Sequence, residues 1–235
     1  MVSRGVKKTE LLHNGHFANA VVWKHWLENG EIVVEKDFSS RFWLIRNTIG
    51  RSLIRREVKF LHAVDSIGVV PGGSRRCGPF SMVENFCEGV TLRQMIAYAT
   101  GNHVAERVME SPRLFALLSS LNVDLFKNLE SALKQVHKMG IVHLDLHNAR
   151  NIIRTSESHC VIIDWQSATH TGMIPRPIRR MLEAIDLAGV YKHWEKLCPG
   201  TLGPQRERIL DWENRRRKLW LLRGLKIDAP AVKKT

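Results

Sequence analysis

A short polar segment set between apolar runs is the feature of this sequence that most restricts its fold. Residues 143–151 are mainly polar, and the apolar stretch 139–142 leads into them. Two further largely apolar runs, 151–153 and 160–163, flank a polar, Ser-rich turn that runs from Arg154 to His159, which predicts a β-hairpin. Three polar side chains would meet where this hairpin closes: Asp145, Asn151 and Asp164.

Two carboxylates and one amide in this arrangement suit phosphoryl transfer. That chemistry needs a carboxylate to receive or orient the attacking hydroxyl, and an Asn and an Asp to hold magnesium on the nucleotide phosphates. Magnesium prefers oxygen ligands, and one or two protein groups plus phosphate oxygens suffice. The sequence therefore predicts Asp145 as the catalytic carboxylate, and Asn151 and Asp164 as magnesium ligands.

The order His143-Leu-Asp145, then Asn151, then Asp164 resembles the catalytic loop and metal-binding Asp of the protein-kinase-like superfamily. Protein kinases carry H-R-D-x-x-x-x-N followed by D-F-G. The distance from Asn151 to Asp164 is 13 positions, which is the family spacing. Asp145 and Asn151 are separated by five residues instead of four, so we expect a bulge in the loop, with Asn148 as the alternative magnesium ligand.

Three further positions of this segment depart from the protein-kinase pattern. Leu144 stands where Arg is usual, and Trp165 stands where the Phe of D-F-G is usual. His147 takes the place of the catalytic-loop Lys, as in the aminoglycoside phosphotransferases. An Arg before the catalytic Asp normally anchors a phosphorylated loop, so we expect no such switch here.

The same segment admits a second interpretation, a metal-dependent hydrolase. His143, Asp145 and His147 alternate, so an extended backbone would place all three on one side. Imidazole and carboxylate groups are plausible ligands of zinc or non-haem iron. A polar loop with structurally satisfied histidines is the third interpretation, and this segment alone does not separate the three.

Upstream, the resemblance rests on a lysine and a glutamate. Lys36 ends a β-rich run, as does the phosphate-binding Lys of V-A-I-K. Glu57 lies in a segment with helical apolar spacing that begins near Ile49, and the resemblance implies that it pairs with Lys36. The hairpin expected over residues 11–23 carries only Gly15 where kinases have three glycines over the phosphates.

Residues 79–92 resemble the hinge between kinase lobes. A strand ends at Glu84, and an aromatic residue and Glu-Gly follow. The resemblance implies that backbone groups from Glu84 to Phe86 bind adenine. Thr91 is a candidate cap for a helix over residues 92–99.

The second half of the chain predicts helices over residues 112–138, 178–195 and 206–224. Two apolar stripes in the first of these are expected in the core: Phe115, Leu117, Leu118 and Leu121, then Leu125, Leu129, Leu133 and Val136. The last helix is basic, with Trp212, Leu219, Trp220, Leu221 and Leu222 interleaved. It suits either a solvated face over a core stripe or an anionic membrane surface.

Composition limits the partners and the compartment. The net charge of +13 favours polyanionic partners. The sequence has no apolar run of about 18 residues, and no secretory signal is expected from its start. The four cysteines lack C-x-x-C spacing and are expected to be reduced, buried thiols of a cytoplasmic protein: Cys77, Cys87, Cys160 and Cys198.

The resemblance implies an α+β, two-lobed protein-kinase-like fold without a long activation segment. Residues 1–85 would form the β-rich amino lobe, and residues 86–235 the mainly helical carboxy lobe. The implied activity is transfer of the ATP γ-phosphate to a hydroxyl, with ATP and Mg²⁺ as cofactors. The chain is most similar to bacterial lipopolysaccharide core (Kdo or heptose) sugar kinases.

The implied acceptor is therefore a sugar on a phosphate-bearing glycolipid, reached from the cytoplasm or from the inner face of the membrane. A RIO-type serine/threonine kinase with a protein acceptor is the alternative. From another class, the chain could be a pseudokinase module that binds nucleic acid or anionic membrane, although nucleic acid is not expected as a partner of the enzyme.

Overall fold

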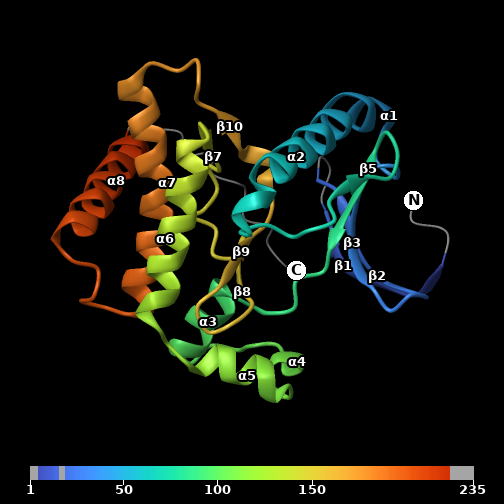
Figure 1. Ribbon diagram of the computed structural model, residues 1–235, viewed down its shortest axis with the longest axis horizontal. Coiled ribbons are helices and arrows are strands. Elements are labelled where there is room, and N and C mark those ends of the chain that lie inside the picture. Colours follow the sequence, from blue (N-terminus) through green and yellow to red (C-terminus); the bar gives the residue numbers. More distant parts are fainter. Residues whose placement is uncertain (1–4, 16–18, 223–235) are drawn as a thin grey trace, which may run out of the picture.

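The computed structural model describes residues 5–15 and 19–222, excluding the side chains of residues 219–222. It is an α+β structure, as expected, with an antiparallel sheet in the amino-terminal part and mostly helices in the rest (Figure 1). No helix in the described ranges is long and apolar enough to cross a membrane.

The amino-terminal sheet has five antiparallel strands in the order β1-β2-β3-β5-β4. They are β1 (Val6–Asn14), β2 (Val21–Leu27), β3 (Ile32–Asp37), β5 (Ser81–Asn85) and β4 (Arg75–Arg76). The pairing of β1 with β2 confirms the hairpin expected over residues 11–23, although residues 16–18 lie outside the described ranges, and β3 pairs with β2 in a second hairpin.

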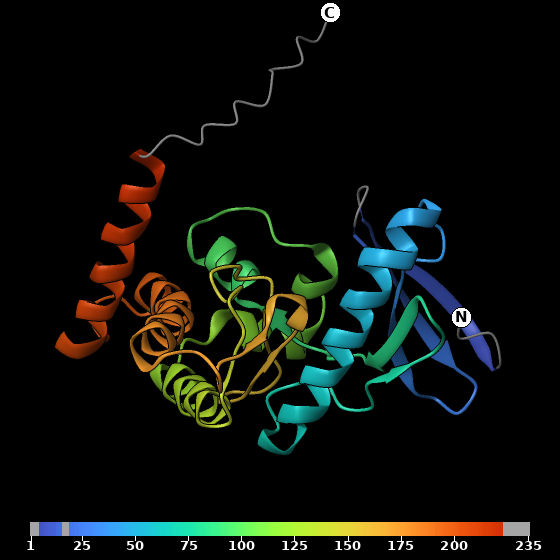
Figure 2. The same ribbon diagram turned by 90° about the horizontal axis from the view of Figure 1, so that it is seen from above.

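A long helix, α2 (Arg51–Val64), lies against this sheet beside β4 and β5 (Figure 2). It follows α1 (Trp43–Ile45) and a π-helical turn, η1 (Arg46–Gly50). Ile54, Val58 and Leu61 repeat at three- and four-residue spacing and are buried. This apolar face also carries Glu57 into the interior, where its side chain is fully buried.

The carboxy-terminal part is built from helices and short strands. The helices are α3 (Leu92–Ala99), α4 (Glu106–Met109), α5 (Pro112–Ser119), α6 (Val123–Lys138), α7 (Arg176–Leu197) and α8 (Pro204–Leu222). Thr91 caps α3 in a capping box with Gln94, as predicted. Figure 1 shows α6, α7 and α8 side by side, and α7 packs between the other two.

Short strands hold the loops that face the amino-terminal sheet. β8 (Ile152–Arg154) and β9 (Cys160–Ile162) pair antiparallel, which confirms the expected hairpin. β6 (Val90–Thr91) joins them on the other edge of β8. β7 (Ile141–Val142) pairs with β10 (Thr169–His170) and so ties the start of the polar loop to the segment after Asp164.

The second apolar stripe is confirmed, whereas the first is partly wrong. Leu125, Leu129, Leu133 and Val136 of α6 are all buried. Phe115 and Leu121 are exposed instead. The helix over residues 112–138 is interrupted because Asn122 caps α6 by accepting a hydrogen bond from Asp124 N, which leaves Leu121 in the connection.

Two other expectations need correction. Arg154 belongs to β8 and not to a solvated turn, because its buried guanidinium donates to the carbonyls of Leu117, Ser120 and Glu157. All four cysteines are free, but only Cys160 and Cys198 are buried, and the other two are partly exposed. The basic helix expected over residues 206–224 is α8. The side chains of residues 219–222 and all of residues 223–224 lie outside the described ranges.

Candidate active site

A buried ion pair joins β3 to α2. Lys36 Nζ donates to Glu57 Oε1, so the predicted pair is present. The second oxygen of Glu57 accepts a hydrogen bond from Gln166 Nε2 at 3.1 Å. Gln166 follows Asp164 by two positions, so this bond links α2 to the segment behind the hairpin.

Lys36 is surrounded by more than one carboxylate. Glu84 Oε1 lies 3.6 Å from its ammonium, and the charge of Asp164 also stabilises it. Burial alone would lower the pKa of Lys36. The carboxylates of Glu57, Glu84 and Asp164 outweigh this effect and raise that pKa above its ordinary value. Burial raises the pKa of Glu84 to about 7, although the ammonium of Lys36 opposes the shift.

The balance of charge here fits a bound cation. Three carboxylates surround the Lys36 ammonium, so its immediate surroundings carry excess negative charge whenever they are ionised, although Arg150 adds a cation to the wall of the same cavity. Asp164 supplies carboxylate oxygens at the wall of the same cavity, and Asn151 supplies an amide oxygen. Oxygen donors of this kind are the ligands that Mg²⁺ prefers.

Asp145 and Asn151 are in contact, as predicted. Asn151 Nδ2 donates to Asp145 Oδ2 at 2.8 Å and to the Asp145 carbonyl at 3.1 Å. Two consecutive turns accommodate the extra loop residue: Asn148 N bonds to the Asp145 carbonyl, and Asn151 N bonds to the Asn148 carbonyl. Asn148 is exposed, whereas Asn151 is buried and lines the cavity, so the geometry favours Asn151 as the metal ligand, with its Oδ1 also accepting from Asn148 Nδ2.

Strained backbone marks both ends of this constellation. Among the described non-glycine residues, only Leu144 (φ +68°) and Asp164 (φ +64°) have a left-handed backbone. This conformation costs free energy in a branched residue such as Leu and persists only where neighbouring groups impose it. Both residues belong to the constellation that the sequence singled out.

Asp186 of α7 imposes the conformation of the loop, and the sequence interpretation missed it. Its carboxylate is buried and accepts hydrogen bonds from His143 N and Leu144 N, both at 2.6 Å. It also contacts His137 Nε2 at 3.2 Å. Gly189, one turn later, allows close approach, because a Cβ there would lie 2.7 Å from the Leu146 carbonyl carbon.

The geometry of His143 does not suit a metal ligand. Its Nδ1 accepts from Asp145 N, and its Nε2 donates to the Ile163 carbonyl. Burial lowers its pKa, so the neutral ring serves as a structural bridge between the loop and the end of the hairpin. Nowhere in residues 5–15 and 19–222 do three His, Cys, Asp or Glu residues gather as a metal site.

His147 faces away from this constellation, toward α8. Its Nε2 lies 3.5 Å from Glu213 Oε1, whose side chain is buried. Burial lowers the pKa of His147, and Arg217 acts in the same direction. His147 therefore shares with the catalytic-loop Lys of kinases its position in the sequence, but it does not contribute its side chain to this constellation.

A cavity of about 380 Å³ connects most of the predicted residues. Its walls include Lys36, Glu84, Phe86, Asn151 and Asp164. Asp145 lies next to it, through its hydrogen bond to Asn151. Gly15 is not part of its wall, and it lies so close to Ala20 that a Cβ at Gly15 would be 2.3 Å from the Ala20 carbonyl oxygen.

The contribution of the hinge differs from the expectation. The Phe86 N–H donates to the Ile32 carbonyl and is therefore not free to bind a base. Its ring lines the cavity instead, with Lys24 Nζ 3.7 Å from the ring centroid. Glu84 contributes its buried side chain to the charge cluster around Lys36, a role that the sequence did not indicate.

No protein-family model matches the chain, and no curated protein matches its sequence.

Proposed function

We propose that this protein is an ATP-dependent phosphotransferase with a protein-kinase-like fold, and that its acceptor is a sugar hydroxyl. One observation carries the proposal. Lys36, paired with the buried Glu57, lines the same cavity as Asn151 and Asp164, although these residues come from distant parts of the chain. A buried ion pair contributes little net stability, because the loss of hydration offsets the attraction between the charges. A functional reason for the Lys36–Glu57 pair is therefore favoured over a purely stabilising one.

The residues have distinct roles in the proposed reaction. Lys36, held by Glu57, contacts the phosphates of the nucleotide. Asn151 and Asp164 would hold Mg²⁺, which would supply positive charge to the phosphates of the nucleotide. Asp145 orients the acceptor hydroxyl and receives its proton, and its bond to Asn151 fixes the carboxylate relative to the metal ligands.

A sugar of the lipopolysaccharide core is the acceptor that we propose. Two features support it: the net charge of +13 suits a phosphate-bearing glycolipid, and only residues 165–175 connect Asp164 to α7. A connection of this length leaves no room for a long activation segment. ATP and the acceptor would meet in the cytoplasm, at the inner face of the membrane.

Phosphate transfer to defined acceptors tests this proposal. The purified protein would be incubated with γ-labelled ATP, Mg²⁺ and either purified core glycolipid or a mixture of dephosphorylated proteins. We expect label in the glycolipid, and none when Asp145→Asn replaces the wild type. Label in proteins alone would favour a RIO-type protein kinase, and no label in either would contradict the proposed enzyme.

A further inference from the structure

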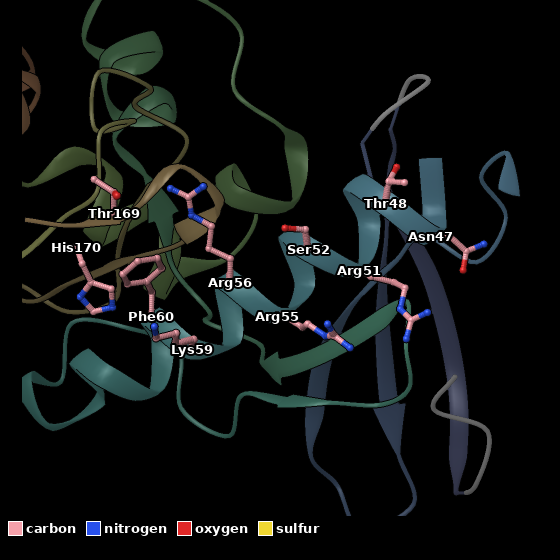
Figure 3. Close-up of a pocket in the computed structure, with 10 residues that line it drawn as sticks. All are labelled: Asn47, Thr48, Arg51, Ser52, Arg55, Arg56, Lys59, Phe60, Thr169 and His170. Carbon is pink, nitrogen blue, oxygen red and sulfur yellow. The ribbon is translucent and has the colours of Figure 1, made fainter. Parts of the chain in front are cut away.

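A basic groove on the opposite side of α2 from Lys36 has no role in the proposed reaction. It has a volume of about 800 Å³ and lies between α2 and the segment around His170 (Figure 3). Four cationic side chains of α2 line it: Arg51, Arg55, Arg56 and Lys59. Its size is that of a ligand pocket and its charge is of one sign.

The cations of the groove follow from helical spacing. Arg51, Arg55 and Lys59 recur every four residues, so they form one ridge along α2. Arg56 forms the inner wall, where its guanidinium donates twice to the Ala168 carbonyl. Phe60 closes the end of the groove, with its ring centroid 4.8 Å from that of His170.

The charge of this ridge is not neutralised within the described chain. None of Arg51, Arg55 and Lys59 forms an ion pair in residues 5–15 and 19–222. Glu57, the only acid of α2, points into the interior and pairs with Lys36. The groove is therefore open to an anion.

An exposed apolar cluster continues the same ridge toward the amino terminus of the helix. Trp43 and Leu44 precede the groove residues Asn47 and Thr48 by one turn, and their carbonyls accept from those two side chains. Phe42 and Trp43 are 63% and 59% exposed, and their ring centroids lie 6.0 Å apart. Leu44 is also exposed, at 49%.

We propose that this surface docks on an anionic lipid bilayer, with phosphate headgroups in the groove and the aromatic cluster in the acyl boundary. Aromatic residues next to arginines and lysines favour the membrane interface, where each cation contributes about fivefold in affinity. Charge complementarity and the adjoining apolar cluster favour a lipid over a free phosphate or an RNA. This docking goes beyond the proposed transfer reaction and does not depend on it.

Vesicle flotation tests the docking without nucleotide. The full chain would be mixed with vesicles of phosphatidylcholine alone, or with 30% phosphatidylglycerol, in roughly physiological salt. We expect binding to the anionic vesicles only. The double variant Arg55→Ala/Lys59→Ala should lose at least about tenfold in affinity.

A charge-matched control separates the groove from the overall basicity of the chain. Arg75→Ala/Arg76→Ala removes two exposed cations from β4 and the same net charge. We expect its vesicle affinity to stay within about twofold of the wild type. An equal loss in both double variants would overturn the proposal, because binding would then follow net charge alone.

Tryptophan quenching by brominated lipid reports insertion. Quenching in the wild type should fall in Trp43→Phe, which keeps an aromatic side chain at this position, while vesicle binding changes little. Unchanged quenching would overturn the insertion of this cluster. Binding of pyrophosphate or RNA by Arg55 and Lys59, without vesicle binding, would overturn the lipid as the partner.

Discussion

Lys36 Nζ on β3 and Glu57 Oε1 on α2 form an ion pair in the interior, across 21 residues of sequence. Glu84 and Asp164 add two further carboxyl groups near the same ammonium. The pair thereby couples the position of α2 to the charge of the cavity. Substitutions in this pair should therefore change the free energy of unfolding and the affinity for ATP in different ways.

Replacing Lys36 with Met should destabilise the protein. The change leaves Glu57 and Glu84 buried without their cation, and breaking a buried pair in this way costs about 3–5 kcal/mol. The free energy of unfolding, measured by urea denaturation near pH 7, checks this. A loss below about 1 kcal/mol would mean that water or another group compensates the carboxylates.

The double variant Lys36→Met/Glu57→Gln separates stability from binding. Removing one carboxylate charge should restore part of the lost free energy of unfolding. ATP affinity should remain as low as in Lys36→Met, because the phosphate-binding ammonium is still absent. Recovery of ATP binding in the double variant would show that Lys36 does not contact the nucleotide.

Asp145→Asn should reduce phosphate transfer by about 10²–10⁴-fold and leave ATP affinity nearly unchanged. The substitution removes the proton acceptor, while the amide oxygen can still accept from Asn151 Nδ2. Single-turnover transfer and equilibrium binding measure the two effects. Asp124→Asn, which alters an exposed carboxylate paired with Lys127, is the matched control and should change neither.

Asp186→Asn should weaken both the fold and the catalytic loop. An amide offers one acceptor oxygen, so one of the two buried N–H groups of the loop loses its partner, at about 1–3 kcal/mol. Denaturation and transfer assays measure the loss. Glu183→Gln on the same helix removes only a surface pair with Arg179, so a comparable effect there would contradict the anchoring role.

Stability should fall as the pH drops from 6.5 toward 4, in part through His193. This side chain is buried and donates to the Leu146 carbonyl, and burial lowers its pKa from 6.5 to about 4. In this window the unfolded chain binds a proton that the folded chain does not, so the free energy of unfolding rises with pH. The full effect is about 3 kcal/mol.

His193→Gln should flatten this pH dependence, since Gln can still donate to the Leu146 carbonyl but does not titrate. His143 and the half-buried His147, whose pKa values are also lowered by burial, keep part of the slope. Urea denaturation of both proteins at several pH values between 4 and 7 provides the comparison. If the free energy of unfolding depended on pH in the same way in both proteins, the pKa of His193 would be the same in the folded and the unfolded chain.

The parts of the site that the sequence predicted correctly are those fixed by local pattern. The hairpin places Asn151 and Asp164 through strand length and turn composition, and Lys36 and Glu57 each sit on an element with clear periodicity. The contact between Lys36 and Glu57 could be expected because the resemblance to kinases implied it. The spacing of the apolar residues alone would not have predicted this contact.

The missed features depend on contacts between distant segments. Asp186 is 43 positions from His143, and its only signal was a carboxylate directly flanked by apolar residues, Ile185 and Leu187, in its helix. The Phe86 N–H is taken by Ile32, which depends on how far the pairing of β3 with β5 extends. Arg154 resembled a turn residue, and two of the four carbonyls that hold its guanidinium in the interior come from the distant end of α5.

Calorimetry of ATP binding, with and without Mg²⁺, tests the central claim most directly. The wild type should bind ATP only when Mg²⁺ is present, and Asp164→Asn should bind at least about tenfold more weakly, because it loses a carboxylate ligand at the cavity wall. Equal affinity in both proteins, or no ATP binding by the wild type, would contradict the assignment of this cavity as a magnesium–nucleotide site.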